Sequence, residues 1–283
     1  MTAVEIGLTD GGTERVVVRQ FGTRATSAIP DIAKVEFRLL HLLEQESVPA
    51  PRPIYLDADG ELSGAPLIVT SWVDGTPDLS GIDGQVVCEE LASYLARLHT
   101  CSSETNDLSF LPALDARLAS MLDAASHDDS ATPTVAAIRD ALEPIWPWPP
   151  TRPGVVLHGD FWPGNMMWRD GHLVAAVDWE DAVCGDPLFD LASVRLELLW
   201  LFGEREVRTF TERYLAITEI DPSDLPRWDL CAALDPAIHL STWHKPPELE
   251  RHMHAELARF VDRARVELTR RIDAGRRVTS PLP

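Results

Sequence analysis

The sequence predicts an α+β fold of two lobes: a small antiparallel β-sheet lobe over residues 1–70, a hinge over residues 71–75 and a larger, mainly helical lobe over residues 76–283. Two observations support this division. Runs of β type and a single helix fill the small lobe, and helical periodicity dominates after the turn signal Asp74-Gly75. The chain has 283 residues, of which 45% are hydrophobic, so it is long enough to bury a core.

The small lobe begins with a predicted hairpin. Residues 3–9 and 14–20 are β-type runs joined by Asp10-Gly11-Gly12, whose glycines can supply the positive φ of a tight turn. Over residues 27–46 the apolar side chains recur at intervals of three and four residues. This period predicts one helix with a buried face.

The rest of the chain alternates predicted strands and helices. The prolines of VPAPRPIYL favour an extended path, because each fixes its own φ and restricts the preceding residue. Compact apolar runs predict strands over residues 65–73, 154–158, 165–169 and 172–177. Periodic apolar residues predict helices over residues 83–100, 112–126, 131–145, 188–218 and 248–275.

The composition limits the choice of partners. With 45 acidic and 25 basic residues, the formal charge is −20, so the chain should repel the phosphate backbone of a nucleic acid. We expect no nucleic-acid partner. The same charge favours a cationic small molecule in any acidic cleft, and it fits a solubilising surface equally well.

The cysteines and the absence of long apolar runs point to a cytoplasmic protein. The four cysteines are scattered without a CxxC pair, which favours reduced thiols over disulfides or a zinc site. The start MTAVEIGLTDGG has no basic segment followed by an apolar one, and no stretch approaches the length of a spanning helix. We therefore expect no membrane partner. The sequence leaves the oligomeric state open.

The segment LHGDFWPGNMMW, residues 157–168, places Asp160 and Asn165 in one loop between two predicted strands. A loop aspartate can accept a proton from an attacking hydroxyl, and a neutral amide oxygen can bind Mg²⁺ without adding charge beside that base. Asp178 follows at the end of the next apolar strand, where its carboxylate would face the same ion. This spacing is the arrangement of the catalytic and metal-binding loops of protein kinases.

The sequence here resembles the aminoglycoside phosphotransferase family, the kinase-like small-molecule phosphotransferases that include choline kinases. HGDFWPGNMMW and VDWEDAVCGDPLFDLA resemble the two signature segments, and ELASYLARLH resembles the helix before them. The resemblance extends from about Val16 to about Leu201. It implies a protein-kinase-like fold and transfer of the γ-phosphoryl group of ATP or GTP, with Mg²⁺, to a hydroxyl of a small molecule such as an aminoglycoside or another antibiotic.

The resemblance also implies roles for residues of the large lobe. Asp160 would be the catalytic base, and Asn165 and Asp178 would hold Mg²⁺. His158 would support the loop. Asp186 precedes a proline at a predicted helix start, where a side-chain acceptor can cap free amides, so we expect it to support the structure around that loop.

In the small lobe, the resemblance implies a nucleotide site. In such folds a cation on a central strand holds the phosphates and pairs with a glutamate of the following helix. Arg19 and Glu36 have the expected order and spacing, and an arginine can contact two phosphate oxygens at once. The backbone from Ser71 to Val73 would then bind the adenine edge. The alternative for Arg19 and Glu36 is an ordinary surface arginine and an ordinary surface glutamate. The alternative for Ser71 to Val73 is a strand that simply ends in a turn.

Two departures from the family keep other functions open. Family members usually carry one more strand and a nucleotide-covering loop before the hairpin, so we expect the first strand to be missing ahead of Arg19. Either the start lies upstream, or the lid is reduced, or the protein is a nucleotide-binding pseudokinase without turnover. The resemblance is weakest where the acceptor binds, so a choline- or homoserine-type metabolic kinase is a further alternative.

Two metal sites are less favoured. A metal-dependent hydrolase could use His158 with Asp160, Asp178, Glu180, Asp181, Asp186 and Asp190, but two-metal hydrolases usually draw on several histidines. Of these carboxylates, Asp186 and Asp190 are expected to serve structure. A second cluster contains His239, His244, His252 and His254. Because side chains two residues apart diverge on a helix, we expect solvated or partner-facing histidines there.

Overall fold

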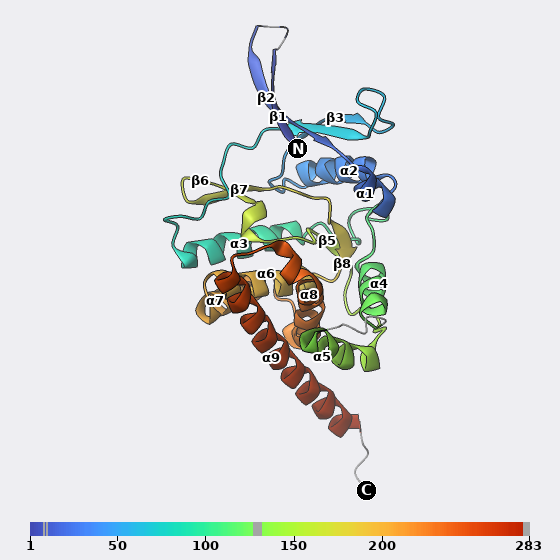
Figure 1. Ribbon diagram of the computed structural model, residues 1–283, viewed down its shortest axis with the longest axis vertical. Helices are drawn as coiled ribbons and strands as arrows, with labels where there is room; N and C mark the ends of the chain where they lie inside the picture. Colours follow the sequence, from blue (N-terminus) through green and yellow to red (C-terminus); the bar gives the residue numbers. More distant parts are fainter. Residues whose placement is uncertain (8, 10, 127–131, 280–283) are drawn as a thin grey trace.

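The computed structural model describes residues 1–7, 9, 11–126 and 132–279. Leu8 of the first predicted strand, Asp10 of the predicted turn and Ala131 at the start of a predicted helix lie outside these residues. Figure 1 shows a sheet with its helices at one end of the molecule and a larger body of helices at the other. The predicted two-lobed α+β fold is therefore confirmed.

The small lobe contains a four-stranded antiparallel sheet in the order β1-β2-β4-β3. Its strands are β1 (Thr2–Gly7), β2 (Thr13–Gln20), β3 (Pro53–Asp57) and β4 (Leu67–Ser71). β1 and β2 form the predicted hairpin. Because β2 pairs with β1 on one side and β4 on the other, Arg19 near its end lies on a central strand.

Two helices follow β2 where the sequence predicted one helix over residues 27–46. They are α1 (Thr23–Ala28) and α2 (Ile32–Gln45). Pro30 separates them, because proline lacks an amide hydrogen and disfavours the helical conformation of the residue before it, which is extended here (φ −132°, ψ 100°). The buried face of α2 includes Glu36.

Four short strands form two antiparallel pairs in the large lobe. β5 (Val155–Leu157) pairs with β8 (Val183–Gly185), and β6 (Met166–Arg169) pairs with β7 (His172–Ala176). β5, β6 and β7 confirm predicted strands. β8 was not predicted, because three residues are too few to display a period. The loop that carries Asp160 connects the two pairs.

The helices of the large lobe are α3 (Gly84–Leu98), α4 (Leu114–Ser126), α5 (Pro133–Leu142), α6 (Leu188–Leu201), α7 (Glu204–Thr218), α8 (Leu225–His239) and α9 (Pro247–Thr279). Residues 188–218 are helical as predicted, and they form two helices, α6 and α7, because Gly203 between them adopts a φ of +95°. α8 was missed. Ten of its residues are buried, so no polar face marks it as a helix in the sequence.

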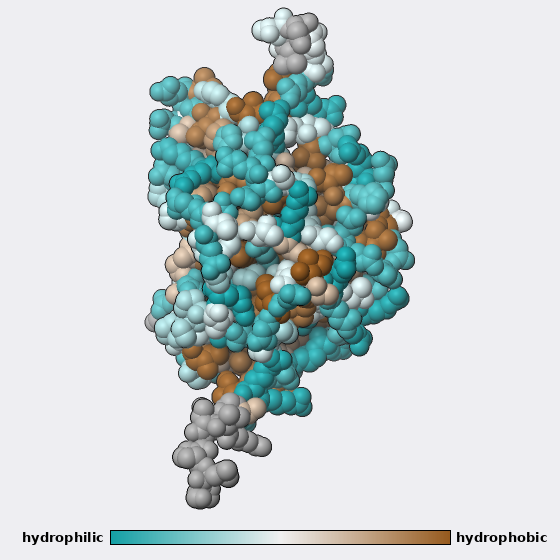
Figure 2. Space-filling view, turned by 180° about the vertical axis from the view of Figure 1, so that it is seen from behind, coloured by the Kyte–Doolittle hydropathy of each residue, from teal (hydrophilic) through white to brown (hydrophobic). Residues whose placement is uncertain are grey.

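The surface and the cysteines of the described residues show no further candidate site. Figure 2 shows a mainly hydrophilic face on which apolar side chains are scattered. No helix in the described part of the chain combines the length and the apolar character needed to cross a bilayer. All four cysteines are free, as their spacing predicted.

Candidate active site

The loop after β5 turns sharply at Gly159. Its φ is +77°, and a Cβ atom at this position would lie 2.0 Å from the carbonyl oxygen of Asp181. Only glycine therefore fits here without a shift of the backbone. The close approach holds the loop against the segment that follows Asp178 and sets the direction in which the next residue, Asp160, leaves the turn.

Asp190, in the first turn of α6, anchors this loop through its side chain. Its carboxylate is fully buried and accepts hydrogen bonds from the backbone amides of His158 at 2.8 Å and Gly159 at 3.2 Å. The His158 ring is also fully buried, and its Nε2 lies 3.0 Å from the carbonyl oxygen of Val177. The loop is thus tied both to α6 and to the residue before Asp178.

The two residues of the sequence motif are in contact. Nδ2 of Asn165 donates to the Asp160 carboxylate at 2.8 Å and to the Asp160 carbonyl oxygen at 3.0 Å. A carboxylate can only accept from the amide, so the side-chain oxygen of Asn165 must point away from Asp160. Within the described residues no donor reaches that oxygen, which leaves it available for a cation.

The environment of Asp160 favours a proton acceptor. The pKa of Asp160 is raised to about 6, mainly by burial and then by the charges of Asp181 and Asp178, whereas the hydrogen bond from Asn165 lowers it. A carboxylate whose pKa lies closer to neutrality is a stronger base and is still ionised near pH 7. The loop therefore presents a group that can take a proton from a hydroxyl.

Arg19 of the small lobe reaches across to the large lobe. Its Nη1 lies 2.7 Å from Oδ1 of Asp178, and its Nη2 lies 2.6 Å from Oε2 of Glu180. Glu36 on α2 is the third carboxylate, with its Oε1 at 3.5 Å from Nη1. The structure brings Arg19, Glu36 and Asp178 together, although Arg19 hydrogen-bonds Asp178 and Glu180 and not Glu36.

Glu36 is almost completely buried in this cluster. Burial raises the pKa of Glu36 to about 7, while the charge of Arg19 lowers it. Its second oxygen, Oε2, is buried without a hydrogen-bond partner in the described structure. The neighbouring guanidinium of Arg19 offsets part of the desolvation cost of ionising this buried carboxyl.

The donor set around Asp178 fits a magnesium ion. Mg²⁺ takes oxygen ligands and is commonly bound by one or two carboxylates together with phosphate oxygens. The Asn165 side-chain oxygen and the partly exposed Asp178 carboxylate, at 31% exposure, provide oxygen ligands of this type. Within the described residues, no group of three or more His, Cys, Asp or Glu side chains could hold a metal ion.

The predicted hinge residues differ in their backbone contacts. The amide of Ser71 donates to the carbonyl oxygen of Arg52 at 2.8 Å, so it is not free for a ligand. Val73 follows the end of β4, and neither its amide nor its carbonyl makes a hydrogen bond within the described residues. Of the two, Val73 offers the free backbone groups.

The other predicted residues lie in separate contacts. Asp186 accepts two bonds from Nη1 of Arg152, at 2.6 and 2.8 Å, and one from the amide of Leu188 at 2.9 Å. It caps the start of α6, and among the described residues it forms no hydrogen bond with the loop that Asp190 anchors. In the histidine cluster, His239 pairs with Asp235 at 3.0 Å and His254 lies 3.2 Å from the Ser241 hydroxyl.

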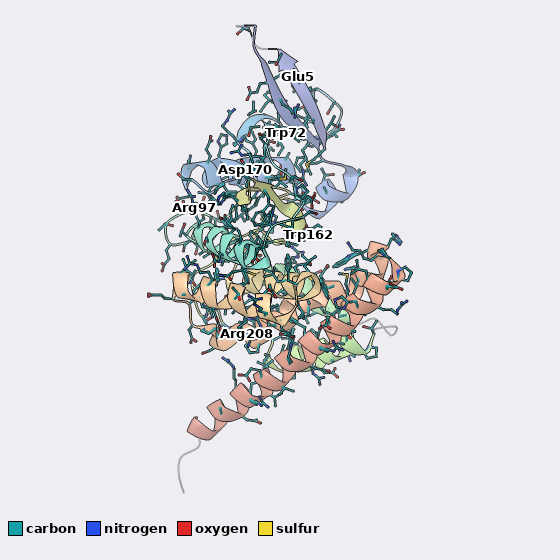
Figure 3. The ribbon with its side chains drawn as sticks, turned by 90° about the vertical axis from the view of Figure 1, so that its left-hand side faces the viewer. Glu5, Trp72, Arg97, Trp162, Asp170 and Arg208 are labelled. Atoms are coloured by element: carbon teal, nitrogen blue, oxygen red, sulfur yellow. The ribbon has the colours of Figure 1, made fainter. Side chains whose placement is uncertain are left out.

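A cavity of about 440 Å³ opens beside Asp160. Its walls come from the loop, from α4, α6 and α8, and from the start of α9. Trp162, at one edge of this cavity, lies between the small lobe and the helices of the large lobe in Figure 3. Glu197 and Lys245 also line it, and neither was predicted as a site residue. No local motif marks Glu197 or Lys245, because the two side chains reach the same cavity only when α6 and the segment before α9 pack together.

Comparisons with known proteins identify the family of the chain and its fold. The sequence model of the phosphotransferase enzyme family matches residues 3–231. Homoserine kinase of Rhodospirillum rubrum is 30% identical over 207 residues, which cover 66% of this chain and 59% of that protein. The chain therefore spans about three fifths of that relative.

Solved structures resemble the whole fold. Amicoumacin kinase in complex with AMP-PNP, Ca²⁺ and Ami aligns with a TM-score of 0.65 at 15% identity, covering 93% of this chain and 84% of that one. The apoenzyme of macrolide 2′-phosphotransferase from Brachybacterium faecium aligns with a TM-score of 0.60 at 19% identity, covering 90% and 86%. At these identities the likeness concerns the fold alone. The family match over residues 3–231, together with this fold, shows that the chain belongs to the phosphotransferase enzyme family and has its kinase-like architecture.

Proposed function

We propose that the protein is a kinase that transfers the γ-phosphoryl group of ATP or GTP to a hydroxyl of a small molecule. The observation that carries this proposal is the contact between Asn165 and Asp160 at the edge of a cavity of about 440 Å³. The charge of Asp178 also raises the pKa of Asp160, which supports a shared role for Asp160, Asn165 and Asp178. A base, a candidate metal site and room for an acceptor are what such a transfer needs.

Asp160 is the catalytic base of the proposed reaction. It orients the acceptor hydroxyl and takes its proton while the hydroxyl oxygen forms a bond to the γ-phosphorus. The bond from that phosphorus to the bridging oxygen breaks, and the nucleoside diphosphate leaves. Asn165 and Asp178 would hold Mg²⁺, which would supply positive charge to the phosphates.

The small lobe holds the nucleotide in this proposal. Arg19, held beside Glu36, exchanges its contacts with Asp178 and Glu180 for phosphate oxygens. The free backbone of Val73 binds the adenine edge, with Ser71 at the start of the same segment. We infer a nucleotide lobe over residues 1–70, a hinge over 71–75 and an acceptor lobe over 76–283.

A panel of acceptors tests the proposal. Aminoglycosides, macrolides, choline, homoserine and sugars would be incubated with the protein, Mg²⁺ and labelled ATP or GTP, and phosphate transfer would be measured. The names of the relatives support this choice, since one is a homoserine kinase and another a macrolide phosphotransferase. We expect transfer to at least one class.

The pseudokinase alternative gives a different pattern. It predicts that Mg²⁺ and ATP raise the melting temperature while no compound in the panel receives phosphate. Transfer to any one acceptor would exclude it. The hydrogen bond from Asn165 to Asp160 beside the cavity favours the active enzyme, because it orients a carboxylate toward space that an acceptor can occupy.

A further inference from the structure

The charged side chains that line the cavity differ in whether they have a hydrogen-bond or ion-pair partner within the protein. Most of them have partners among the described residues: Asp160 with Asn165, Asp181 with Arg117, and Asp235 with His239. Two do not. Glu197 and Lys245 line the same cavity, and neither forms a hydrogen bond or an ion pair with any described residue.

Glu197 lies on the face of α6 that also carries Phe189 and Ser193, two other residues of the cavity wall. It is partly buried, so its carboxyl is only partly hydrated. Lys245 lies just before α9 and is also partly buried, and its ammonium is 6.0 Å from the centre of the Trp243 ring. The two groups have opposite charges and stand too far apart to pair with each other.

Partly buried charged groups without partners are unfavourable unless a ligand supplies the missing contacts. We propose that the acceptor is a zwitterion, a hydroxy compound whose amine pairs with Glu197 and whose anionic group, such as a carboxylate, pairs with Lys245 while its hydroxyl lies at Asp160. This inference rests on the proposed function and narrows it to hydroxy amino acids and molecules that contain one.

The electrostatics of Glu197 support an amine partner. Burial, and after it the charge of Asp160, raises the pKa of Glu197, while the charge of Lys245 lowers it, and together these effects bring the pKa to about 8. The charge of Lys245 therefore offsets the cost of ionising this carboxyl only in part. A bound ammonium would supply the charge that is missing.

The rest of the wall argues against a polycation. Phe161, Phe189 and Leu196 line the cavity and can pack against a hydrocarbon or aromatic body. Additional amines of a polycationic acceptor would meet these side chains and the ammonium of Lys245. A molecule with one amine and one anionic group has no additional amine to place against these apolar side chains or against Lys245.

Three small hydroxy compounds separate the two contacts. L-Homoserine carries a hydroxyl, an amine and a carboxylate. 3-Aminopropan-1-ol lacks the carboxylate, and 4-hydroxybutanoate lacks the amine. threo-Phenylserine keeps all three groups and adds an aromatic body. We expect the highest kcat/KM for homoserine or phenylserine and lower values for the two compounds that lack one group.

The substitutions Glu197→Gln and Lys245→Met test which contact belongs to which residue. Loss of a charged contact corresponds to about a 10- to 100-fold loss of kcat/KM. We expect Glu197→Gln to lower kcat/KM by this factor for homoserine and 3-aminopropan-1-ol and to leave 4-hydroxybutanoate unchanged. Lys245→Met should do the reverse, affecting homoserine and 4-hydroxybutanoate only.

Two variants outside the cavity serve as matched controls. Glu212→Gln makes the same change at an exposed site on α7, and Lys34→Met removes the other lysine of the chain. Neither should alter kcat/KM for any of the compounds. Melting temperatures of all four variants show whether a loss of activity follows from a loss of folding.

The outcomes separate this inference from the proposed function. Transfer to kanamycin or a macrolide, with none to homoserine or phenylserine, would overturn the zwitterion and leave the kinase standing. No transfer to any acceptor would overturn the proposed function. If both variants affected all three compounds equally, the assignment of the amine to Glu197 and of the anion to Lys245 would be wrong.

Discussion

The two ends of the cleft are built differently. At the loop end, Asp160, Asp178 and Asp190 all have partners within the protein, and the loop that carries Asp160 is fixed by α6 and by a glycine turn. At the cavity end, Glu197 and Lys245 come from separate segments, and neither forms a hydrogen bond or an ion pair with a residue that the structure describes. The loop end is thus arranged before any ligand arrives, as chemistry requires, whereas the cavity end leaves contacts to be made by the acceptor.

Removal of the metal should have the largest effect. Excess EDTA should lower phosphate transfer by about 10³-fold or more, because a bound metal ion supplies several kcal/mol of charge stabilisation. The melting temperature without nucleotide should not change, since Arg19 already neutralises Asp178 and Asn165 already binds Asp160. Transfer that persists in EDTA would show that the loop end needs no metal.

Substitution of the loop anchor comes next. Asp190→Asn replaces one of the two acceptors for the amides of His158 and Gly159 with a donor, and so leaves a buried amide unpaired. We expect the free energy of unfolding to fall by about 2–3 kcal/mol in urea denaturation. Asp140→Asn on α5, where the side chain is 63% exposed, is the control and should change it little. Equal stabilities would mean that Asp190 does not hold the loop.

Arg19 tests the link between the two lobes. Arg19→Met removes the cation that binds the phosphates in the proposed function and should weaken nucleotide binding by about 10- to 100-fold, measured by calorimetry. Arg19→Lys keeps the charge and should lose less, because a lysine cannot contact two oxygens in a fixed geometry. Arg208→Met, on an exposed arginine of α7 that Figure 3 shows in the helical lobe, should bind nucleotide normally.

The smallest expected effect is the pH dependence of stability at the cavity end. The pKa of Glu197 is about 8 in the folded protein and 4.5 ordinarily, so the folded state holds a proton that the unfolded state releases. The stability that this carboxyl contributes is complete below pH 4.5 and is lost as the pH rises toward 8. Glu197→Gln stays neutral and should lose less stability over this window, as measured by urea denaturation at several pH values. A pH profile identical to that of the wild type would contradict the raised pKa.

The difference between the loop end and the cavity end also explains which site residues the sequence could predict. Asp160, Asn165 and Asp178 lie within 19 residues of each other in the chain, and their strand-loop-strand context is local, so a spacing pattern is enough to find them. Arg19 and Glu36 required a resemblance as well, since the two side chains come together only when the small lobe folds. Glu197 and Lys245 could not be found, because their meeting depends on how α6, α8 and α9 pack.

The errors in the fold have a similar origin. Pro30 divides residues 27–46, where the apolar period predicted one helix, between α1 and α2. Proline is a local helix breaker, so this break can be expected from the sequence itself. α8 was a different case. Its surroundings bury it on nearly all sides, and only the folded lobe explains why so apolar a segment is a helix.

The most direct measurement compares the wild type with Asp160→Asn on an acceptor that receives phosphate. The amide keeps the shape of the side chain but cannot take a proton from the hydroxyl. The account predicts that kcat falls by about 10²- to 10⁴-fold while the nucleotide Kd stays within about a factor of three. An Asp160→Asn variant that transfers phosphate at the wild-type rate would contradict the central claim that this loop carries out the chemistry.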